Sequence, residues 1–218
     1  MRHWLLAFIL LPLQAQDPIQ KLVESLYPAN SRLKEIRMPE IVHQLNIHEG
    51  SQVADVGCGA GEFSAILARV VGSAGKVYCE DIVDERDWGI RKARANLKKQ
   101  HIKNAVVIRG SSGDPKLSEG PLDAVLIVNA YHEMPQYQSM LRHIQESLKP
   151  GGRLVILDNT PFRTARRPRE KQTANHVLSP DLAAAELQTA GFSIIDREDT
   201  FIDNPDSESA HWLIAAVR

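Results

Sequence analysis

The stretch that most constrains the fold is a short apolar run followed at once by three alternating glycines. Residues 53–56 have the length and composition of a buried strand, and Gly57, Gly59 and Gly61 interrupt it. From Glu62 onwards apolar residues recur at helical spacing, which predicts a strand, a tight loop and a helix. Glycine tolerates positive φ and lets a ligand lie against the backbone, while the first N–H groups of a helix favour an anionic group. The stretch therefore predicts an α/β fold that binds a nucleotide-like ligand.

The glycine spacing differs from that of dinucleotide-binding proteins. Their G-x-G-x-x-G fingerprint needs a third glycine at position 62, where this chain has Glu62. The pattern is instead D-x-G-x-G-x-G from Asp55, and it resembles the first motif of class I S-adenosylmethionine-dependent methyltransferases. The resemblance implies that Asp55 serves the ammonium group of the cofactor. It also implies that the loop binds the cofactor through Asp55, Gly57, Cys58, Gly59 and Gly61.

Two later segments carry the same resemblance. The apolar segment 76–82 ends in acid, and an acid at the end of a second strand can accept hydrogen bonds from both ribose hydroxyls. The resemblance favours Asp81 over Glu80 for this contact and includes Ile82 among the cofactor-binding residues. The run L-K-P-G-G-R-L-V-I-L-D at 148–158 is similar to the family's turn and fifth strand. Together the motifs extend the resemblance over residues 37–217.

The adenine end of the site departs from the family pattern. After the predicted third strand, 105–109, members of the family commonly carry an Asp that contacts the adenine amino group. Ser111 stands at that position here, and the acid comes only at Asp114. We therefore expect Ser111 or Ser112 to make the adenine contact through backbone or hydroxyl.

A fourth predicted strand, 122–128, leads to the acceptor end of the site. Its apolar run is typical of a parallel strand covered on both faces, and the carboxyl ends of such strands border the ligand crevice. The resemblance places the next segment beside the reacting methyl group, with Asn129 at the cofactor and Tyr131 and His132 handling the acceptor. His132 suits a general base because its pKa lies near working pH. The alternative is that Tyr131 and His132 only form the wall of the pocket.

The end of the fifth predicted strand carries oxygen ligands of the kind found in a metal site. Cation-dependent O-methyltransferases carry Asp-Asn there, as in Asp158 and Asn159, together with an Asp after the fourth strand. Asn129 takes the place of that Asp here, and losing a carboxylate weakens a site for a hard cation. The sequence therefore predicts no metal. His176 is expected at the edge of the pocket.

The resemblance implies a doubly wound, Rossmann-like α/β fold with helices on both faces of a seven-stranded sheet. The expected strand order is 3-2-1-4-5-7-6 with the last strand antiparallel, and the short connection between segments 193–201 and 210–217 suits such a pair. Helices are predicted over 84–100, over 137–148 and from a cap at Ser179. Residues 51–218 form the predicted methyltransferase domain, and 16–50 form leading helices that cap the site.

Residues 1–15 have the features of a secretory signal peptide. A basic start with Arg2 is followed by a short apolar run and by Ala15 before a polar segment. The run is shorter than the ~20 residues of a membrane span. We predict cleavage after Ala15 and export to the periplasm or beyond. The alternative is an N-terminal helix of a cytoplasmic protein, which would explain access to S-adenosylmethionine more simply.

The chain has two cysteines, too few for a disulfide scaffold. A bridge between Cys58 and Cys79 is conceivable if their strands are neighbours, but it would stiffen the cofactor loop. We therefore predict two free thiols.

These features predict an enzyme that uses S-adenosylmethionine, and releases S-adenosylhomocysteine, to methylate an acceptor that the sequence does not identify. A net charge of −1 gives no basic field for nucleic acid, so we expect a small-molecule acceptor and no stable membrane span. The basic stretch 163–171 is predicted to be a solvated loop, with a lid over an anionic acceptor as the alternative. Two other classes remain open: a non-catalytic binding protein on a cofactor fold, and an NAD-dependent oxidoreductase, which Glu62 disfavours.

Overall fold

The computed structural model covers the predicted methyltransferase domain almost completely. It describes residues 36–85, 88–117, 120–160, 165–204 and 209–218, together with four positions before residue 36. The predicted signal peptide and most of the first leading helix lie outside the described residues. Within the described part, no helix combines the length and the apolar character needed to cross a membrane.

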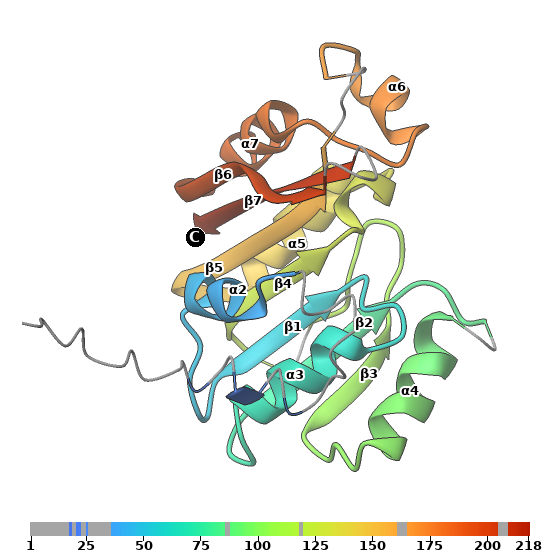
Figure 1. The fold of residues 1–218 in the computed structure, drawn as a ribbon, viewed down its shortest axis with the longest axis vertical. Helices are drawn as coiled ribbons and strands as arrows, with labels where there is room; N and C mark the ends of the chain where they lie inside the picture. The colour runs from blue at the N-terminus through green and yellow to red at the C-terminus, as the bar shows by residue number, and fades with distance from the viewer. Residues whose placement is uncertain are drawn as a thin grey trace, which may run out of the picture.

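A seven-stranded sheet in the order β3-β2-β1-β4-β5-β7-β6 forms the centre of the molecule (Figure 1). The strands are β1 (Gln52–Val56), β2 (Lys76–Asp81), β3 (Ala105–Arg109), β4 (Leu122–Val128), β5 (Leu148–Asn159), β6 (Ser193–Asn204) and β7 (Ser209–Val217). The first five strands are parallel, and β7 runs antiparallel to both β5 and β6. The predicted strand order and the antiparallel last strand are confirmed.

Helices cover both faces of the sheet and bury hydrophobic clusters on each face. One face is covered by α2 (Met38–Leu45), α3 (Glu62–Val70) and α4 (Gly89–Lys99), and the other by α5 (Tyr137–Ser147) and α7 (Pro180–Thr189). Alternation along β1 divides its side chains between them: Val53 packs in the core with α3, and Ala54 packs in the core with α5. Two short helices, η2 (Tyr131–Glu133) and α6 (Arg169–Thr173), lie in the connections.

The helix predicted over 84–100 begins later than expected, at Gly89. Asp84 instead forms an isolated bridge with Gly89, whose φ is +64°, and its carboxylate lies 3.2 Å from Nε of Arg91. The predicted start at residue 84 is therefore wrong, and no acid lies in the first turn of α4. Lys98 and Lys99 lie in its last turn, where they complement the helix dipole.

The connection from α5 to β5 also differs from the prediction. The helix ends at Ser147, and the Pro-Gly-Gly segment lies inside the bounds of β5. Leu148 pairs with Leu122, and the register then shifts before the regular ladder resumes. Gly151 has a φ of +78° in this irregular part, a value that glycine takes without strain. The next predicted cap is confirmed, since Oγ of Ser179 accepts a 3.3 Å hydrogen bond from the N–H of Leu182 in α7.

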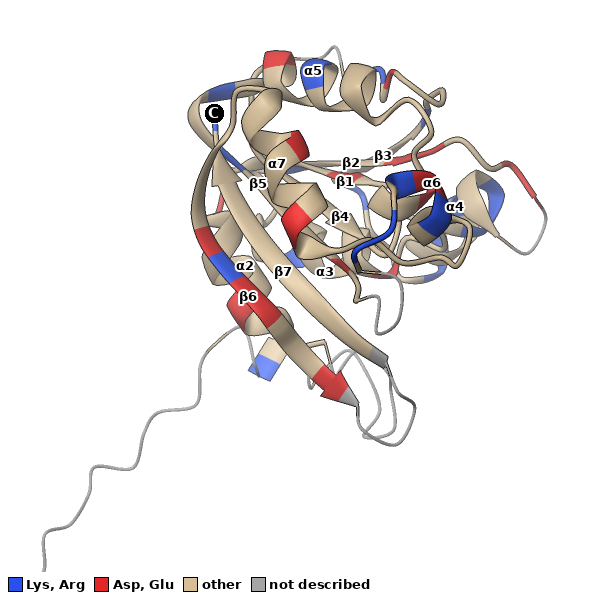
Figure 2. Ribbon diagram, turned by 90° about the horizontal axis from the view of Figure 1, so that it is seen from above, with Lys and Arg blue, Asp and Glu red and all other residues tan. Residues whose placement is uncertain are grey.

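The edge strand β6 carries a row of charged residues (Figure 2). Arg197 of this strand lies 2.6 Å from a carboxylate oxygen of Asp181 at the start of α7. Charges along a sheet edge discourage pairing with another strand, so the sheet ends at β6.

Candidate functional site

The glycine loop joins β1 to α3 at the carboxyl end of the sheet. Gly57, Gly59 and Gly61 have φ values of +74°, +52° and +74°. A Cβ on Gly57 would lie 2.5 Å from Cβ of Ala130, and one on Gly59 would lie 2.8 Å from Cζ2 of Trp88. Gly57 has no space for a side chain, and the positive φ of Gly59 disfavours one, so the bare backbone of the loop lines the site.

Two adjoining cavities open at this end of the sheet. The first, of about 150 Å³, lies beside Asp81 at the end of β2. The second, of about 400 Å³, lies beside the glycine loop and His132. Four residues line both cavities and so join them: Gly57, Trp88, Asn129 and Glu133. The candidate site therefore consists of two joined compartments.

A larger hollow of about 780 Å³ lies at the other end of the strands, beside Gly50, Lys76 and Asn104. In open α/β sheets ligands bind at the carboxyl ends of the strands. We therefore place the functional site in the two joined cavities.

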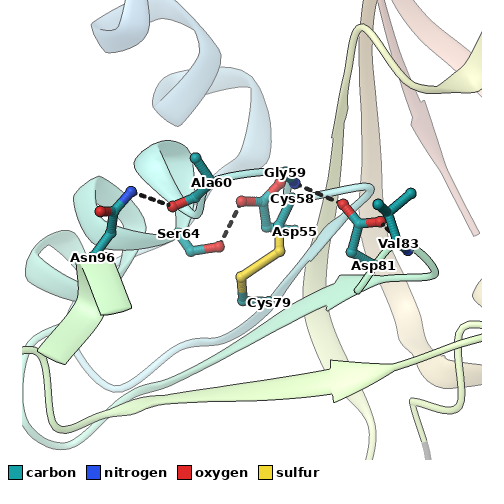
Figure 3. The surroundings of a disulfide bond; sticks show 9 residues. All are labelled: Asp55, Cys58, Gly59, Ala60, Ser64, Cys79, Asp81, Val83 and Asn96. Carbon is teal, nitrogen blue, oxygen red and sulfur yellow. Dashed lines mark hydrogen bonds between the residues drawn. A yellow bond between two sulfur atoms is a disulfide. The ribbon is translucent and has the colours of Figure 1, made fainter. Parts of the chain in front are cut away.

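Asp81 ends β2 with its carboxylate held by two backbone N–H groups (Figure 3). Oδ2 accepts a 2.9 Å hydrogen bond from Gly59, and Oδ1 accepts one of 2.8 Å from Val83. Each oxygen retains a further lone pair for a hydroxyl donor. Asp81 lines the first cavity, so its carboxylate can be reached by a ligand there. Its contact with the ribose hydroxyls stays a prediction.

Asp55 has a different position from the one predicted. Its place in the β1 alternation turns the side chain toward α3, where Oδ2 accepts a 2.6 Å hydrogen bond from Oγ of Ser64 (Figure 3). Burial raises the pKa of Asp55 to about 6, even though the Ser64 hydroxyl favours the ionised form. The residue lines neither of the two cavities. A direct contact with the ammonium group of the cofactor therefore has no support in this arrangement, and Asp55 instead joins α3 to β1.

Cys58 and Cys79 form a disulfide bond, with their Cα atoms 5.5 Å apart (Figure 3). The prediction of two free thiols is wrong. The parallel register sets Cys79 opposite Asp55, and the loop then turns back over β2. There the N–H groups of Gly57 and Cys58 both donate to the carbonyl oxygen of Glu80, at 2.9 and 2.8 Å. The disulfide therefore ties the glycine loop to the neighbouring strand.

Glu80 is a buried acid of the first cavity, although the ribose contact was predicted for its neighbour Asp81. Burial raises its pKa to about 8, and the charge of Asp81 adds to the shift. Its Oε1 has no hydrogen-bond partner among the described residues. A Cβ on Gly110 would lie 1.9 Å from that oxygen, so the glycine makes room for the acid. The adjacent pair of acids at the strand end was the signal in the sequence that pointed to both.

The residues predicted at the adenine end line the first cavity. Ser111 is held by a backbone bridge to Asp114, and Oγ of Ser112 accepts a 3.0 Å hydrogen bond from Nε2 of Gln136. Ile82 is 46% exposed and adds apolar surface beside them. The structure thus brings these three residues together, and their contact with adenine stays a prediction.

Asn129 lies where the two cavities meet. Its backbone has a φ of +50°, and its N–H donates to the carbonyl oxygen of Leu157 at 2.8 Å. Its Oδ1 is buried and has no hydrogen-bond partner among the described residues. Buried polar atoms are nearly always satisfied, so a free amide oxygen at this junction fits a site that a ligand completes.

His132 is buried in the wall of the second cavity. Its Nδ1 lies 2.6 Å from Oδ1 of Asp158, and its backbone N–H donates to Oδ2 of the same carboxylate at 2.8 Å. Because a carboxylate only accepts, Nδ1 carries the proton of the neutral ring and Nε2 is left with the lone pair. Nε2 lies 3.6 Å from Oε1 of Glu133. Burial lowers the pKa of His132, but the carboxylates of Asp158 and Glu133 outweigh it, and the net pKa is raised.

Tyr131 does not reach either cavity. Its hydroxyl donates to Oε2 of Glu186 in α7 at 2.7 Å, and Nε of Arg169 donates to the other oxygen at 2.9 Å. Desolvation raises the pKa of the phenol. The predicted part of Tyr131 in handling the acceptor has no support, because the side chain joins η2 to α7. Arg169, from the basic stretch, belongs to this buried group.

Glu133 and His176 complete the polar wall beside His132. Nδ1 of His176 lies 3.0 Å from Oε1 of Glu133, and the His132 and His176 rings meet edge to face with centroids 5.8 Å apart. His176 was expected at this edge of the pocket, whereas Glu133 was not predicted. Trp88 was not predicted either, and its only signal was an aromatic residue shortly after the second strand.

The leading segment contributes one described residue to the site, Ile36, which lines the second cavity. α2 itself packs on β4 and β5, with Ile41 and Leu45 in the core shared with α3. α2 is thus a covering helix of the sheet. A capping role for the residues before 36 stays a prediction.

Comparison with known proteins identifies the family. Residues 47–203 match the family model described as a methyltransferase domain. The demethylmenaquinone methyltransferase of Listeria welshimeri is 24% identical over 153 residues, covering 66% of this chain and 64% of that protein. The protein-L-isoaspartate O-methyltransferase of Methanothrix thermoacetophila is 30% identical over 112 residues, covering 51% and 49%. The chain therefore spans less than two thirds of the length of these curated relatives.

Solved structures share the fold. A SAM-dependent methyltransferase from Aquifex aeolicus has a TM-score of 0.70 and 23% identity, with 93% of this chain and 99% of that chain covered. An arsenic(III) S-adenosylmethionine methyltransferase from Chlamydomonas reinhardtii has a TM-score of 0.62 and 16% identity, with 93% and 74% covered. The family match extends over most of the residues that form the sheet and the two cavities. The chain therefore belongs to the class I S-adenosylmethionine-dependent methyltransferase family.

Proposed function

We propose that this protein transfers a methyl group from S-adenosylmethionine to a small-molecule acceptor. The observation that carries the proposal is the pair of joined cavities, with Asp81 in one and His132 in the other. The positively charged sulfonium group of the cofactor activates its methyl group. When the methyl group is transferred, the electron pair of the S–CH₃ bond stays on sulfur. The protein then contributes mainly alignment and exclusion of water.

The residues present fit this cofactor. The carboxylate of Asp81 is fixed by two backbone N–H groups and keeps acceptor capacity for ribose hydroxyls. Asn129 presents an unsatisfied amide oxygen where the cavities meet. Gly57 and Gly59 present bare backbone to the site at positive φ, a conformation that other residues rarely adopt.

The second cavity supports a small acceptor. Its walls combine apolar Ile36, Phe63 and Val128 with a polar side formed by His132 and neighbouring residues. Its volume of about 400 Å³, which the acceptor would share with the part of the cofactor beside the glycine loop, falls in the range of small-molecule sites, roughly 300–1,000 Å³. A relative named demethylmenaquinone methyltransferase also favours a small-molecule acceptor.

We further propose that the protein is exported to an oxidising compartment. The disulfide between Cys58 and Cys79 supports this location, because such bonds are rare in reducing cytosol. The signal-peptide features of residues 1–15 agree with it. Cell fractionation with alkylation of free thiols tests the proposal, and a reduced protein found in the cytoplasm would contradict it.

Titration calorimetry tests the enzymatic proposal first. S-adenosylmethionine and S-adenosylhomocysteine should bind, whereas NAD should give no heat. A radiolabelled-methyl assay against phenols, hydroquinones, thiols, amines and a peptide then identifies the acceptor class. If neither sulfur compound binds, under oxidising and reducing conditions alike, the enzymatic proposal is wrong. The protein would then be a non-catalytic binding protein with this fold.

A further inference from the structure

Three side chains on the acceptor side of the second cavity form a cluster of metal-ligating groups. They are His132, Glu133 and His176, all of which line this cavity. We propose that they bind one divalent metal ion of the zinc type in an open site that faces the acceptor. Metal binding stands independently, whereas the role of the ion in catalysis rests on the proposed methyl transfer.

The spacing of the three groups suits one ion. One ligand atom from each residue can be chosen so that all lie within 4.8 Å of one another. Oε1 of Glu133 is 3.6 Å from Nε2 of His132 and 3.0 Å from Nδ1 of His176. Ligands at zinc distances in a tetrahedral site stand roughly 3.3–3.5 Å apart. Only a small approach of the two histidines is needed, and the exposed side chain of His176 can supply it.

Two residues at the end of β5, Asp158 and Asn159, hydrogen-bond to the two histidines. Asp158 binds Nδ1 of His132 and thereby leaves Nε2 as the lone pair beside Glu133. Nδ2 of Asn159 donates to the carbonyl oxygen of His176 at 3.2 Å. A carboxylate behind a metal-binding histidine fixes its ring orientation and raises its basicity. Asp158 and Asn159, considered above as direct ligands, thus hold the ligands, and this proposal replaces the prediction of no metal.

The burial of the three residues points to an open site. The side chain of His132 is 4% exposed, whereas those of Glu133 and His176 are 59% and 75% exposed. One ligand is therefore fixed and two can adjust, with a side of the ion left for water or substrate. Three protein ligands plus an open position are typical of catalytic zinc. An ordinary surface ion pair would involve Glu133 and His176 alone. Here the lone pair of the buried His132 also lies beside the same carboxylate oxygen.

The donor set selects the kind of metal. Two imidazole nitrogens and one carboxylate oxygen suit Zn²⁺ and neighbouring transition metals, while Mg²⁺ and Ca²⁺ prefer oxygen ligands. When Nε2 of His132 binds the ion, it no longer takes a proton, so the metal replaces the predicted general base. A hydroxyl or thiol bound at the open position releases its proton to water more readily. The acceptor class that fits is therefore a compound with an ionisable O–H or S–H.

Metal titration of the untagged full chain, stripped with chelator and dialysed, tests the site. Zn²⁺ should bind with one ion per chain, Co²⁺ should give visible d–d absorption, and Mg²⁺ should give no heat. His176→Ala and Glu133→Gln should each weaken Zn²⁺ binding by about tenfold or more. His48→Ala, which removes an exposed histidine outside the cluster, should leave the affinity unchanged.

The failures of the two proposals are distinguishable when S-adenosylhomocysteine is titrated into the same samples. If the sulfur ligand binds but zinc does not, the metal site is overturned and methyl transfer stands. If zinc binds and the sulfur ligand does not, the metal site stands and the proposed function falls. Equal zinc affinity in wild type, His176→Ala and Glu133→Gln would also overturn the site. Circular dichroism of each variant confirms that it is folded.

Discussion

The carboxylate of Asp158 holds His132 at two points, with Oδ1 2.6 Å from the ring Nδ1 and Oδ2 2.8 Å from the backbone nitrogen. Both residues are buried, and Asp158 lines neither of the two cavities. The ring that faces the acceptor is therefore oriented by a residue behind the cavity wall. One carboxylate sets the position of the ring, its tautomer and the direction of its lone pair.

Asp158→Asn should reverse the tautomer of His132. The amide has nearly the same shape, but its NH₂ group next to Nδ1 favours a proton on Nε2 and removes the lone pair from the cavity. Zinc affinity and methyl transfer should each fall by about tenfold or more, while S-adenosylhomocysteine affinity stays near that of wild type. Nitrogen NMR shifts of the imidazole report the tautomer. An unchanged tautomer together with unchanged zinc affinity would contradict this role for Asp158.

Asp81→Asn should weaken binding of S-adenosylhomocysteine. Hydrogen bonds to a charged group contribute about 1.5–3 kcal/mol, which corresponds to roughly 10- to 150-fold in Kd. The asparagine keeps an oxygen for one of the two backbone donors, so the loop should remain folded. Calorimetry measures the change, with Asp84→Asn as a control acid that lines neither cavity. Equal affinity of wild type and Asp81→Asn for S-adenosylhomocysteine would contradict the predicted contact between Asp81 and the ribose.

Stability should fall as pH rises from about 4.5 to about 8, because burial raises the pKa of Glu80 from 4.5 to about 8 in the folded protein. In this window the folded state keeps a proton that the unfolded chain releases, so each step up in pH favours unfolding. At about 1.4 kcal/mol per pKa unit, the loss is on the order of 3–5 kcal/mol. Asp55, raised to about 6, adds to it with the same sign.

Glu80→Gln isolates the contribution of Glu80. The amide does not ionise, so urea unfolding from pH 5 to pH 8 should show a flatter dependence than wild type. The residual slope belongs to Asp55 and to other acids. Parallel curves for the two proteins would show that Glu80 titrates normally.

Replacing Cys58 and Cys79 together by serine should destabilise the protein by about 3 kcal/mol, the loop-closure value for a bridge over 21 positions. Denaturant unfolding under oxidising conditions measures the loss. Wild type in reducing buffer should approach the stability of the variant. If reduction leaves wild type unchanged, the disulfide contributes nothing to stability in solution.

The strands were predictable because their signals are local and repeat, whereas their order in the sheet was predicted from the resemblance to the methyltransferase family. Apolar runs mark the strands, and glycine loops mark their ends. The short final connection fixed the antiparallel pair around β7. The start of α4 was not predictable in this way, because Asp84 bonds across to Gly89 and Arg91 instead of entering the helix.

The site was only partly predictable, since a motif gives position along the chain but not side-chain direction. Asp81, Asn129 and His132 lie where the motifs indicated. Asp55 and Tyr131 lie in the right segments, but their side chains point to Ser64 and Glu186, on other faces. Strand alternation was the signal available for Asp55. The cluster around His132 depends on segments far apart in sequence, so no local pattern could reveal it.

Trp88 gives the protein a built-in optical reporter. It is 55% exposed, borders both cavities and lies against Gly59, whereas Trp212 is fully buried beneath α7. Indole emission depends on local polarity and on nearby quenching groups. A ligand that enters beside the glycine loop therefore changes the surroundings of Trp88 and leaves those of Trp212 nearly constant, while the third tryptophan, Trp4, belongs to the predicted signal peptide. Cofactor arrival can be followed by intrinsic fluorescence, in real time and without a label.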